Sequence, residues 1–128
     1  MRNLTIAATR QTPEVALLVI EHRLRIAGEA YPENALSFFE PVHKELADYL
    51  AAGHSEPFEA EFELRYLNSA ATIMIFKLAG LLDQAAAKGR PVRLRFVVMA
   101  EDDILRELGA DIKEDCSWLD FEFVEAAA

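Results

Sequence analysis

The chain has 128 residues, 52% of them hydrophobic, so it is long enough for one domain with a hydrophobic core and too apolar to be disordered. Its formal net charge of −9 argues against nucleic acid or an anionic membrane as the principal partner. A single cysteine excludes an intramolecular disulfide, and the first eight residues lack the basic start of a signal peptide. The longest apolar run, interrupted at Lys77, is short of a membrane span. We therefore predict one domain over residues 1–128, cytoplasmic and without a membrane segment.

The N-terminal part of the sequence predicts three strands. Residues 4–9 form a short apolar segment, and the apolar segments 15–20 and 24–28 follow after a proline-containing turn signal. The last two segments are expected to pair as a hairpin that turns near residues 21–23. Arginines alternate with apolar residues in its second strand, which predicts that one face is exposed to water.

Residues 31–34, Tyr-Pro-Glu-Asn, predict the start of a first helix, because Asn34 can cap a helix and proline suits its first turn. Apolar residues recur at helical spacing over 36–50 and form one stripe that should be buried. Pro41 lies inside this pattern, which predicts either a kinked helix or two abutting helices. Gly53 is the expected end.

The rest of the chain alternates between strands and helices. The clearest strand covers residues 58–67, where apolar and charged residues alternate strictly. The elements expected after it are a helix over 70–88 that stops at Gly89, a strand over 92–98, a short acidic helix over 101–108 that stops at Gly109, and an edge strand over 120–124.

This order predicts an α/β fold, in which an N-terminal hairpin and a βαβαβ core form a single-domain mixed sheet flanked by helices. The helix over 70–88 is apolar almost all round at residues 72–76, whereas a helix packed on one side only should have a polar face. Either its first two turns are covered on both sides, or Ile73 and Phe76 with Lys77 form an exposed patch that contacts another protein.

Signatures of common enzymes and metal proteins are absent from the sequence. There is no glycine-rich phosphate loop, no Gly-x-Ser-x-Gly motif and no pair of cysteines. His22, His43 and His54 fall in a turn, a helix and a loop without the spacing of metal ligands, and are expected to be solvated surface or helix-end groups. We predict no catalytic residue, no metal site and no cofactor.

Cys116 follows two acidic residues. Neighbouring carboxylates raise the pKa of a thiol and suppress the reactive thiolate. We therefore expect a small buried or half-buried residue and not a nucleophile.

A small hydroxyl residue lies where the 58–67 strand turns into the next helix. Asn68 and Ser69 stand at this junction, where the free N–H groups and positive end of a helix suit a phosphate. Three interpretations are open: Asn68 or Ser69 caps the helix, Ser69 is a nucleophile, or Ser69 is a phosphorylation site. A nucleophile needs a base, and no histidine lies nearby in sequence. Thr72 is a weaker acceptor, because its hydroxyl can bond to the preceding turn.

The chain resembles the SiaC family of regulatory phosphoproteins, which have an anti-sigma-factor-antagonist-like (STAS-like) architecture. The matching segments occur in family order and span most of the chain, and the Tyr-Pro-Glu-Asn element at 31–34 is the most specific. The other matches are Thr12-Pro13-Glu14, Gly28-Glu29-Ala30, Phe38-Phe39-Glu40-Pro41, Tyr66-Leu67-Asn68-Ser69, Leu81-Leu82-Asp83, Lys88-Gly89 and Glu114-Asp115.

The resemblance implies a non-enzymatic regulator in a partner-switching system. Family members are phosphorylated by a dedicated kinase on a hydroxyl just after the Tyr-Leu-Asn strand end and are dephosphorylated by a PP2C-type phosphatase. The unphosphorylated form binds and activates a diguanylate cyclase, and so controls cyclic di-GMP and biofilm-related behaviour. In this chain the acceptor would be Ser69, with Thr72 as the fallback. The residues expected at the partner contact are Tyr31, Glu33, Asn34, Asn68, Ile73 and Phe76.

The chain departs from the family beside the expected acceptor. Residues 68–71 read Asn-Ser-Ala-Ala where the family usually has Asn-Thr-Ser-Ser, and Ile73 and Lys77 replace a common lysine and a common acidic residue. Two alternatives therefore stay open, and so does the oligomeric state. The first is a constitutive binding module that has lost the phosphoswitch. The second is a small acid–base enzyme that uses Glu29, Glu33 and Asp115.

Overall fold

The strands of residues 2–126, the part of the chain that the computed structural model describes, form one mixed sheet. Its order follows the chain from β1 to β6, with β1–β2–β3 antiparallel and β3–β4–β5–β6 parallel. The predicted hairpin, the parallel core and the α/β mixed-sheet class are therefore confirmed. The strands are β1 (Leu4–Ile6), β2 (Glu14–Leu18), β3 (Arg23–Ala30), β4 (Phe58–Leu67), β5 (Val92–Val98) and β6 (Asp120–Glu125).

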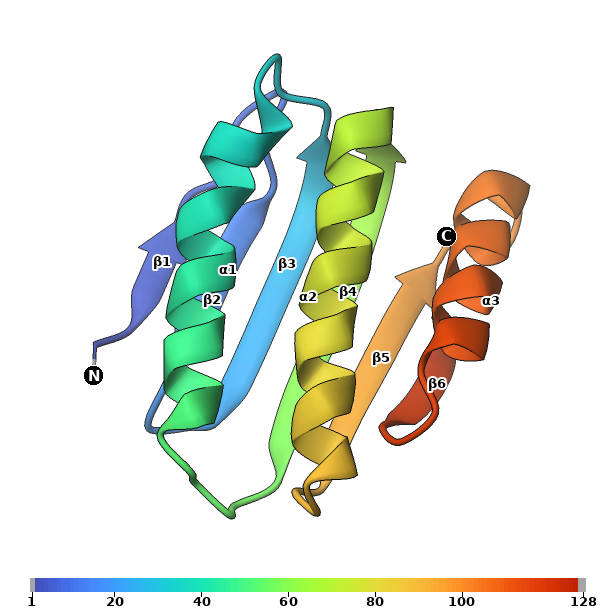
Figure 1. The fold of residues 1–128 in the computed structure, drawn as a ribbon. Coiled ribbons are helices and arrows are strands. Elements are labelled where there is room, and N and C mark those ends of the chain that lie inside the picture. The colour runs from blue at the N-terminus through green and yellow to red at the C-terminus, as the bar shows by residue number, and fades with distance from the viewer. Residues whose placement is uncertain (1, 127–128) are drawn as a thin grey trace.

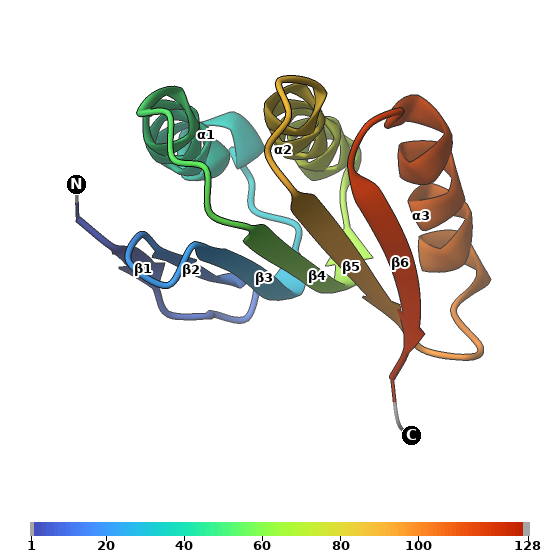
Figure 2. The same ribbon diagram turned by 90° about the horizontal axis from the view of Figure 1, so that it is seen from below.

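Three helices connect the parallel strands: α1 (Ala35–Ala51), α2 (Ser69–Ala87) and α3 (Asp103–Asp115). All three cover the same face of the sheet, as the two views show (Figure 1, Figure 2). The reason is topological, because each parallel strand pairs with the next one in the chain and every right-handed crossover then falls on the same side. The helices therefore flank the sheet on one side only.

The alternation in β4 separates the two faces of the sheet. Phe58 and Phe62 point into the core and are at most 1% exposed. On the opposite face, Arg25 of β3 contacts Glu61 of β4 at 3.1 Å, Glu63 at 3.4 Å and Glu14 of β2 at 2.6 Å. This ionic layer forms the water-exposed face that the alternating arginines predict.

The structure decides between the two alternatives for the first helix and corrects the expected bounds of the third. α1 runs as one helix through Pro41, so the alternative of two abutting helices fails. α3 begins after its N-cap Asp102 and continues through Gly109, which was the expected end. Position 109 needs a glycine because α3 packs closely on β5 and β6. A Cβ atom on Gly109 would lie 2.6 Å from a ring carbon of Phe123 and 2.8 Å from one of Phe96.

α2 is the one helix within residues 2–126 whose length and apolar composition would allow it to cross a membrane. In the fold it lies between α1 and α3, and its inward side chains form part of the core (Figure 2). A central core helix meets the same criteria of length and composition. The buried residues of α2 are Ala71, Met74, Ile75, Leu78, Ala79 and Leu82.

Candidate functional site

The junction between β4 and α2 lies at the edge of the sheet where the parallel strands end and the helices begin. β3 ends at Ala30 and β4 at Leu67, so the segments that follow them, 31–34 and 68–69, come together at the top of the molecule in Figure 1. The backbone N–H of Asn68 donates to the carbonyl of Ala30 at 3.2 Å. The sheet thus joins two sequence elements that are more than thirty residues apart.

Asn68 supplies the cap of α2. Its Oδ1 accepts a hydrogen bond from the Ala71 N–H at 2.9 Å, and its Nδ2 donates to the Pro32 carbonyl at 2.9 Å. Asn34 caps α1 in the same way, through a 3.0 Å bond from the Ser37 N–H. Asn68 is therefore the residue that caps α2, and the hydroxyl of the neighbouring Ser69 is not needed for capping.

Ser69 is the first residue of α2, and its side chain is exposed. Within residues 2–126, neither its hydroxyl nor the backbone N–H groups of Ser69 and Ala70, the first two of the helix, have a hydrogen-bond partner. The N–H groups of the next two residues are already bound, that of Ala71 to the Asn68 side chain and that of Thr72 to the Asn68 carbonyl at 3.0 Å. A phosphate on this hydroxyl would meet free donors and the positive end of the helix dipole.

The fallback acceptor is less well placed. Thr72 is half-buried, and its hydroxyl donates to the Asn68 carbonyl at 3.0 Å, which is the backward bond that its position in the helix predicts. The nucleophile interpretation of Ser69 finds no support, because no histidine within residues 2–126 lies at this end of the fold to act as a base. His22 and His54 are at the opposite end, and His43 is midway along α1.

Exposed apolar side chains surround this junction. Leu36 of α1, Tyr66 of β4, Ile73 of α2 and Ile104 of α3 are between 56% and 79% exposed, and we call these four residues the apolar rim. They make up four of the six large apolar residues exposed within residues 2–126, so the clustering is marked. Exposed apolar groups gathered in one region are typical of a protein contact.

Sequence reasoning found only Ile73 of the apolar rim. Tyr66 continues the apolar alternation of β4, but the pairing of β3 with β4 shifts register between Gly28 and Glu29. The Tyr66 ring contacts Tyr31 edge-on, with 5.3 Å between the ring centroids. The expectation that the buried stripe of the first helix begins at residue 36 is wrong, because Leu36 is 56% exposed and Ala35 faces the core in its place. Leu36 and Ile104 each occupy the second position of a helix, beyond the stripe that faces the sheet. A check for apolar residues in first helical turns would have found both.

A groove between α2 and α3 continues from the rim. Phe76 is half-buried in its wall, whereas Ile73 and Lys77 are exposed, so the first turns of α2 are not covered on both sides. The expected patch is therefore partly exposed, and its contact with another protein stays a prediction. Two carboxylate residues give the groove an acidic border. Its lining consists of Leu67, Thr72, Phe76, Ile104, Leu105 and Leu108, with Glu107 and Asp111.

The acid–base trio is not brought together. Glu29 and Glu33 are exposed near the β3–α1 junction, whereas Asp115 is the last residue of α3, at the opposite end of the fold (Figure 1). The remaining predicted contact residues lie near Ser69: Tyr31 is half-buried, Glu33 and Asn34 are exposed, and Asn68 is half-buried.

Cys116 is a half-buried thiol, as its sequence context predicts. Burial, followed by the charges of Asp83 and Asp115, raises its pKa from 9.0 to about 11. Its Sγ lies 3.9 Å from the Ala79 carbonyl oxygen.

This raised pKa predicts slow alkylation of the folded protein. At pH 8 the folded thiol should react with iodoacetamide roughly 100-fold more slowly than the same thiol in urea-unfolded protein, because thiolate is the reacting species. Because the folded pKa is raised, folding loses stability as pH rises from 9.0 toward 11. Mass spectrometry gives both rates without ambiguity, since the chain has one cysteine. Equal rates in the two states would contradict the prediction.

Comparison with known proteins identifies the family. The model of a family described as "SiaC family regulatory phosphoprotein" matches residues 6–126. The chain belongs to the SiaC family. An uncharacterised protein of Pseudomonas aeruginosa strain UCBPP-PA14 is 33% identical over 118 residues, which cover 92% of this chain and 93% of that protein.

Solved SiaC structures have the same fold. SiaC of Pseudomonas aeruginosa superposes with a TM-score of 0.89 at 32% identity, over 98% of this chain and 100% of that one. A second structure contains the diguanylate cyclase SiaD of Pseudomonas aeruginosa in complex with its activator SiaC. The match to it has a TM-score of 0.88 at 32% identity, over 96% of this chain and 99% of that one. The family resemblance seen in the sequence motifs is therefore confirmed.

Proposed function

We propose that this protein is a non-enzymatic, cytoplasmic regulator whose partner binding is switched by reversible phosphorylation of Ser69. In the unmodified state it binds and activates a diguanylate cyclase, and in the phosphorylated state it releases the cyclase. A dedicated kinase adds the phosphate and a PP2C-type phosphatase removes it. Cyclic di-GMP levels, and through them biofilm-related behaviour, would follow the state of Ser69.

The observation that carries this proposal is the freedom of the Ser69 hydroxyl. Asn68 already caps α2, so modification of Ser69 breaks no hydrogen bond that holds the fold. The side chain is exposed to an approaching kinase. Ala70 and Ala71 leave it as the one hydroxyl in the first three positions of the helix, which makes the modified atom unambiguous.

Phosphorylation would act through charge at an apolar surface. A phosphoserine carries about −1.5 to −2 charge units at neutral pH. The helix N-terminus stabilises this charge in the free protein, whereas a partner covering the apolar rim would have to desolvate it. The modified protein is therefore stable on its own and poor at binding.

The predicted contact residues divide into two roles. Ile73 and Phe76 would be covered by the partner directly, and Tyr31 would support the exposed Tyr66 through their edge-on contact. Asn34 and Asn68 hold the two helix starts in position through their caps. Glu33 is exposed beside them and could receive a basic group of the partner.

The test compares four baits: wild-type protein, Ser69→Ala, Ser69→Asp and Ser69→Asn. Asn has nearly the shape of Asp without its charge, and both are tolerated in a first helical turn. We expect a diguanylate cyclase to be recovered with wild-type, Ser69→Ala and Ser69→Asn baits and lost with Ser69→Asp, as read by mass spectrometry. If the Ser69→Asp bait recovers as much cyclase as the Ser69→Asn and wild-type baits, binding does not respond to charge at position 69 and the protein is a constitutive binding module.

Phosphorylation itself is tested by intact mass after purification from the native cell. Wild-type protein and Thr72→Val should carry one phosphoryl group in part of the population, and Ser69→Ala should carry none. A Ser69→Ala protein that is modified to the wild-type extent would eliminate Ser69 as the acceptor.

A further inference from the structure

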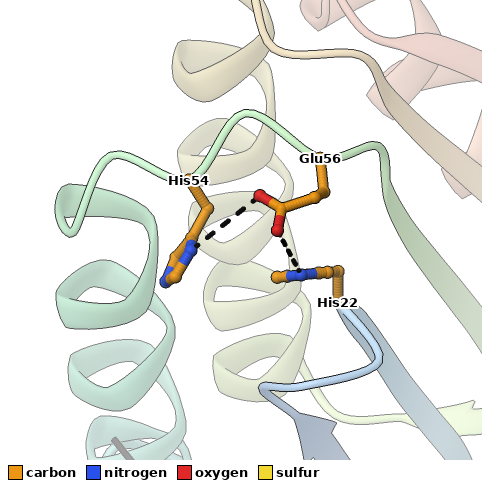
Figure 3. A group of neighbouring side chains, drawn as sticks. All are labelled: His22, His54 and Glu56. Carbon is orange, nitrogen blue, oxygen red and sulfur yellow. Dashed lines mark ion pairs between the residues drawn. The ribbon is translucent and has the colours of Figure 1, made fainter.

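A second cluster of functional side chains lies at the end of the fold opposite to Ser69. His22 is in the β2–β3 turn, and His54 and Glu56 are in the loop between α1 and β4. The Glu56 carboxylate faces a ring nitrogen of each histidine (Figure 3). His22 Nε2 lies 3.2 Å from Glu56 Oε2, and His54 Nδ1 lies 4.0 Å from Glu56 Oε1. The expectation that the histidines are solvated surface or helix-end groups is thus wrong for His22, whose side chain is only 15% exposed.

We propose that His22, His54 and Glu56 form a binding site for a zinc ion, with His22 Nε2, His54 Nδ1 and the Glu56 carboxylate as ligands. Two imidazoles and one carboxylate are a ligand set that suits Zn²⁺ better than Mg²⁺ or Ca²⁺. The candidate ligand atoms all lie within 4.8 Å of one another. Zinc–ligand bonds of 2.0–2.1 Å in a tetrahedron place ligand atoms about 3.3 Å apart, so small side-chain movements suffice.

Neighbouring residues hold the ligands in place. His22 Nδ1 is hydrogen-bonded to the hydroxyl of the buried Tyr49, which leaves Nε2 as the nitrogen that faces Glu56. The His54 ring stacks on Tyr49 at 5.2 Å between centroids. A histidine that binds a metal through one ring nitrogen carries its proton on the other, so in the zinc-bound state the Nδ1–H of His22 would donate to the Tyr49 hydroxyl oxygen, which fixes the ring orientation.

Arg90 ties the supporting groups together. Its Nη2 donates to the Tyr49 hydroxyl at 2.7 Å, and its Nε donates to the backbone carbonyl of Glu56 at 2.7 Å. The loop that carries Glu56 and the tyrosine that orients His22 are therefore fixed to one buried side chain. Such prior ordering reduces the entropy that a metal must remove on binding.

The electrostatic balance permits a cation here. The C-terminal ends of α1 and α2 lie on this side of the fold and contribute partial negative charge. Arg90 opposes a cation, but it approaches His22 on the Nδ1 side, at 3.4 Å, and not on the Nε2 side.

Zinc at this site would clamp two surface connections to each other. Residues 51–57 are all exposed, and the metal would join them to the β2–β3 turn. His54 and Glu56 have side chains 40% and 55% exposed, so a fourth position stays open to water. This role is independent of the proposed phosphoswitch.

The test uses the tag-free, full-length chain, stripped with a chelator and titrated with Zn²⁺ by calorimetry. We expect one zinc ion per wild-type chain and the same for His43→Ala, which removes a histidine outside the cluster. His54→Ala and Glu56→Gln should each weaken binding by more than the roughly 10–100-fold that loss of an outer-shell partner costs. Zinc should also raise the thermal midpoint of wild-type protein, and a chelator should reverse the shift.

Both variants replace largely exposed side chains and should fold, which circular dichroism without metal would verify. Absence of measurable binding to wild-type protein would overturn the proposal, leaving an ion-paired cluster. Equal affinity of the wild type and His54→Ala would overturn it as well, because the zinc would then be bound elsewhere.

Discussion

Ile73→Glu is expected to weaken binding to the cyclase by about 30- to 1000-fold, which corresponds to about 2–4 kcal/mol. Ile73 is 58% exposed one turn after Ser69, so in the proposed complex it is covered by the partner. Its replacement removes apolar contact and introduces a carboxylate that must lose its water without a pairing group. Calorimetric titration with the cyclase recovered by wild-type bait measures the effect, and cyclase activation should fall with occupancy.

The folded state should tolerate this substitution, because Glu is a good helix former and position 73 is largely exposed. The matched control is Ile20→Glu, which changes an 81% exposed isoleucine in the β2–β3 turn at the other end of the molecule. We expect Ile20→Glu to bind like the wild type. If both variants bind normally, the apolar rim is not the contact surface. If both variants lose binding equally, the loss comes from the added negative charge wherever it is placed and not from a contact at Ile73.

Much of the fold follows from local patterns. The alternation of β4 fixes which residues face the core, and its end marks the junction at Ser69. The sequence does not reveal that all helices share one face. That property depends on the order of strands in the sheet, which is a long-range property set by pairings such as Arg23 with Glu59 and Arg93 with Asp120.

The sites were predictable to different degrees. Ser69 lies at a strand–helix boundary, which sequence patterns mark clearly, and the family motif pointed to the same residue. The partners of Asn68 could not be predicted, because the Pro32 carbonyl that it binds belongs to another connection. The cluster of His22, His54 and Glu56 was missed for the same reason: its members come from two separate connections and have no regular spacing.

Gly109 shows how a local rule fails when tertiary packing overrides it. A glycine after a short helical pattern usually marks a helix end, and local reasoning placed the end of α3 there. In the fold, the glycine lets the middle of α3 approach the Phe96 and Phe123 rings, and the helix continues to Asp115. The packing partner Phe123 belongs to β6, fourteen residues further along the chain, so no helix-length pattern reveals it.

Gly109→Ala is expected to destabilise the protein by about 1–3 kcal/mol, although alanine is the better helix former by about 1 kcal/mol. The added methyl would lie 2.6 Å from Phe123 and 2.8 Å from Phe96, so at least one ring must move. Phe96 is 1% exposed and packs against both Phe121 and Phe123, so its movement disturbs the packing between β5, β6 and α3. Urea unfolding followed by circular dichroism measures the change in the free energy of unfolding.

Gly80→Ala is the matched control, because Gly80 lies in the interior of α2 and a Cβ atom there would meet nothing within 4 Å. The same chemical change should therefore stabilise the protein there, by up to about 1 kcal/mol. Opposite signs at the two positions would separate helix propensity from packing, since propensity predicts a gain at both. Stabilisation by Gly109→Ala would mean that the rings move aside at little cost and that the contact of α3 with the sheet is looser than the structure indicates.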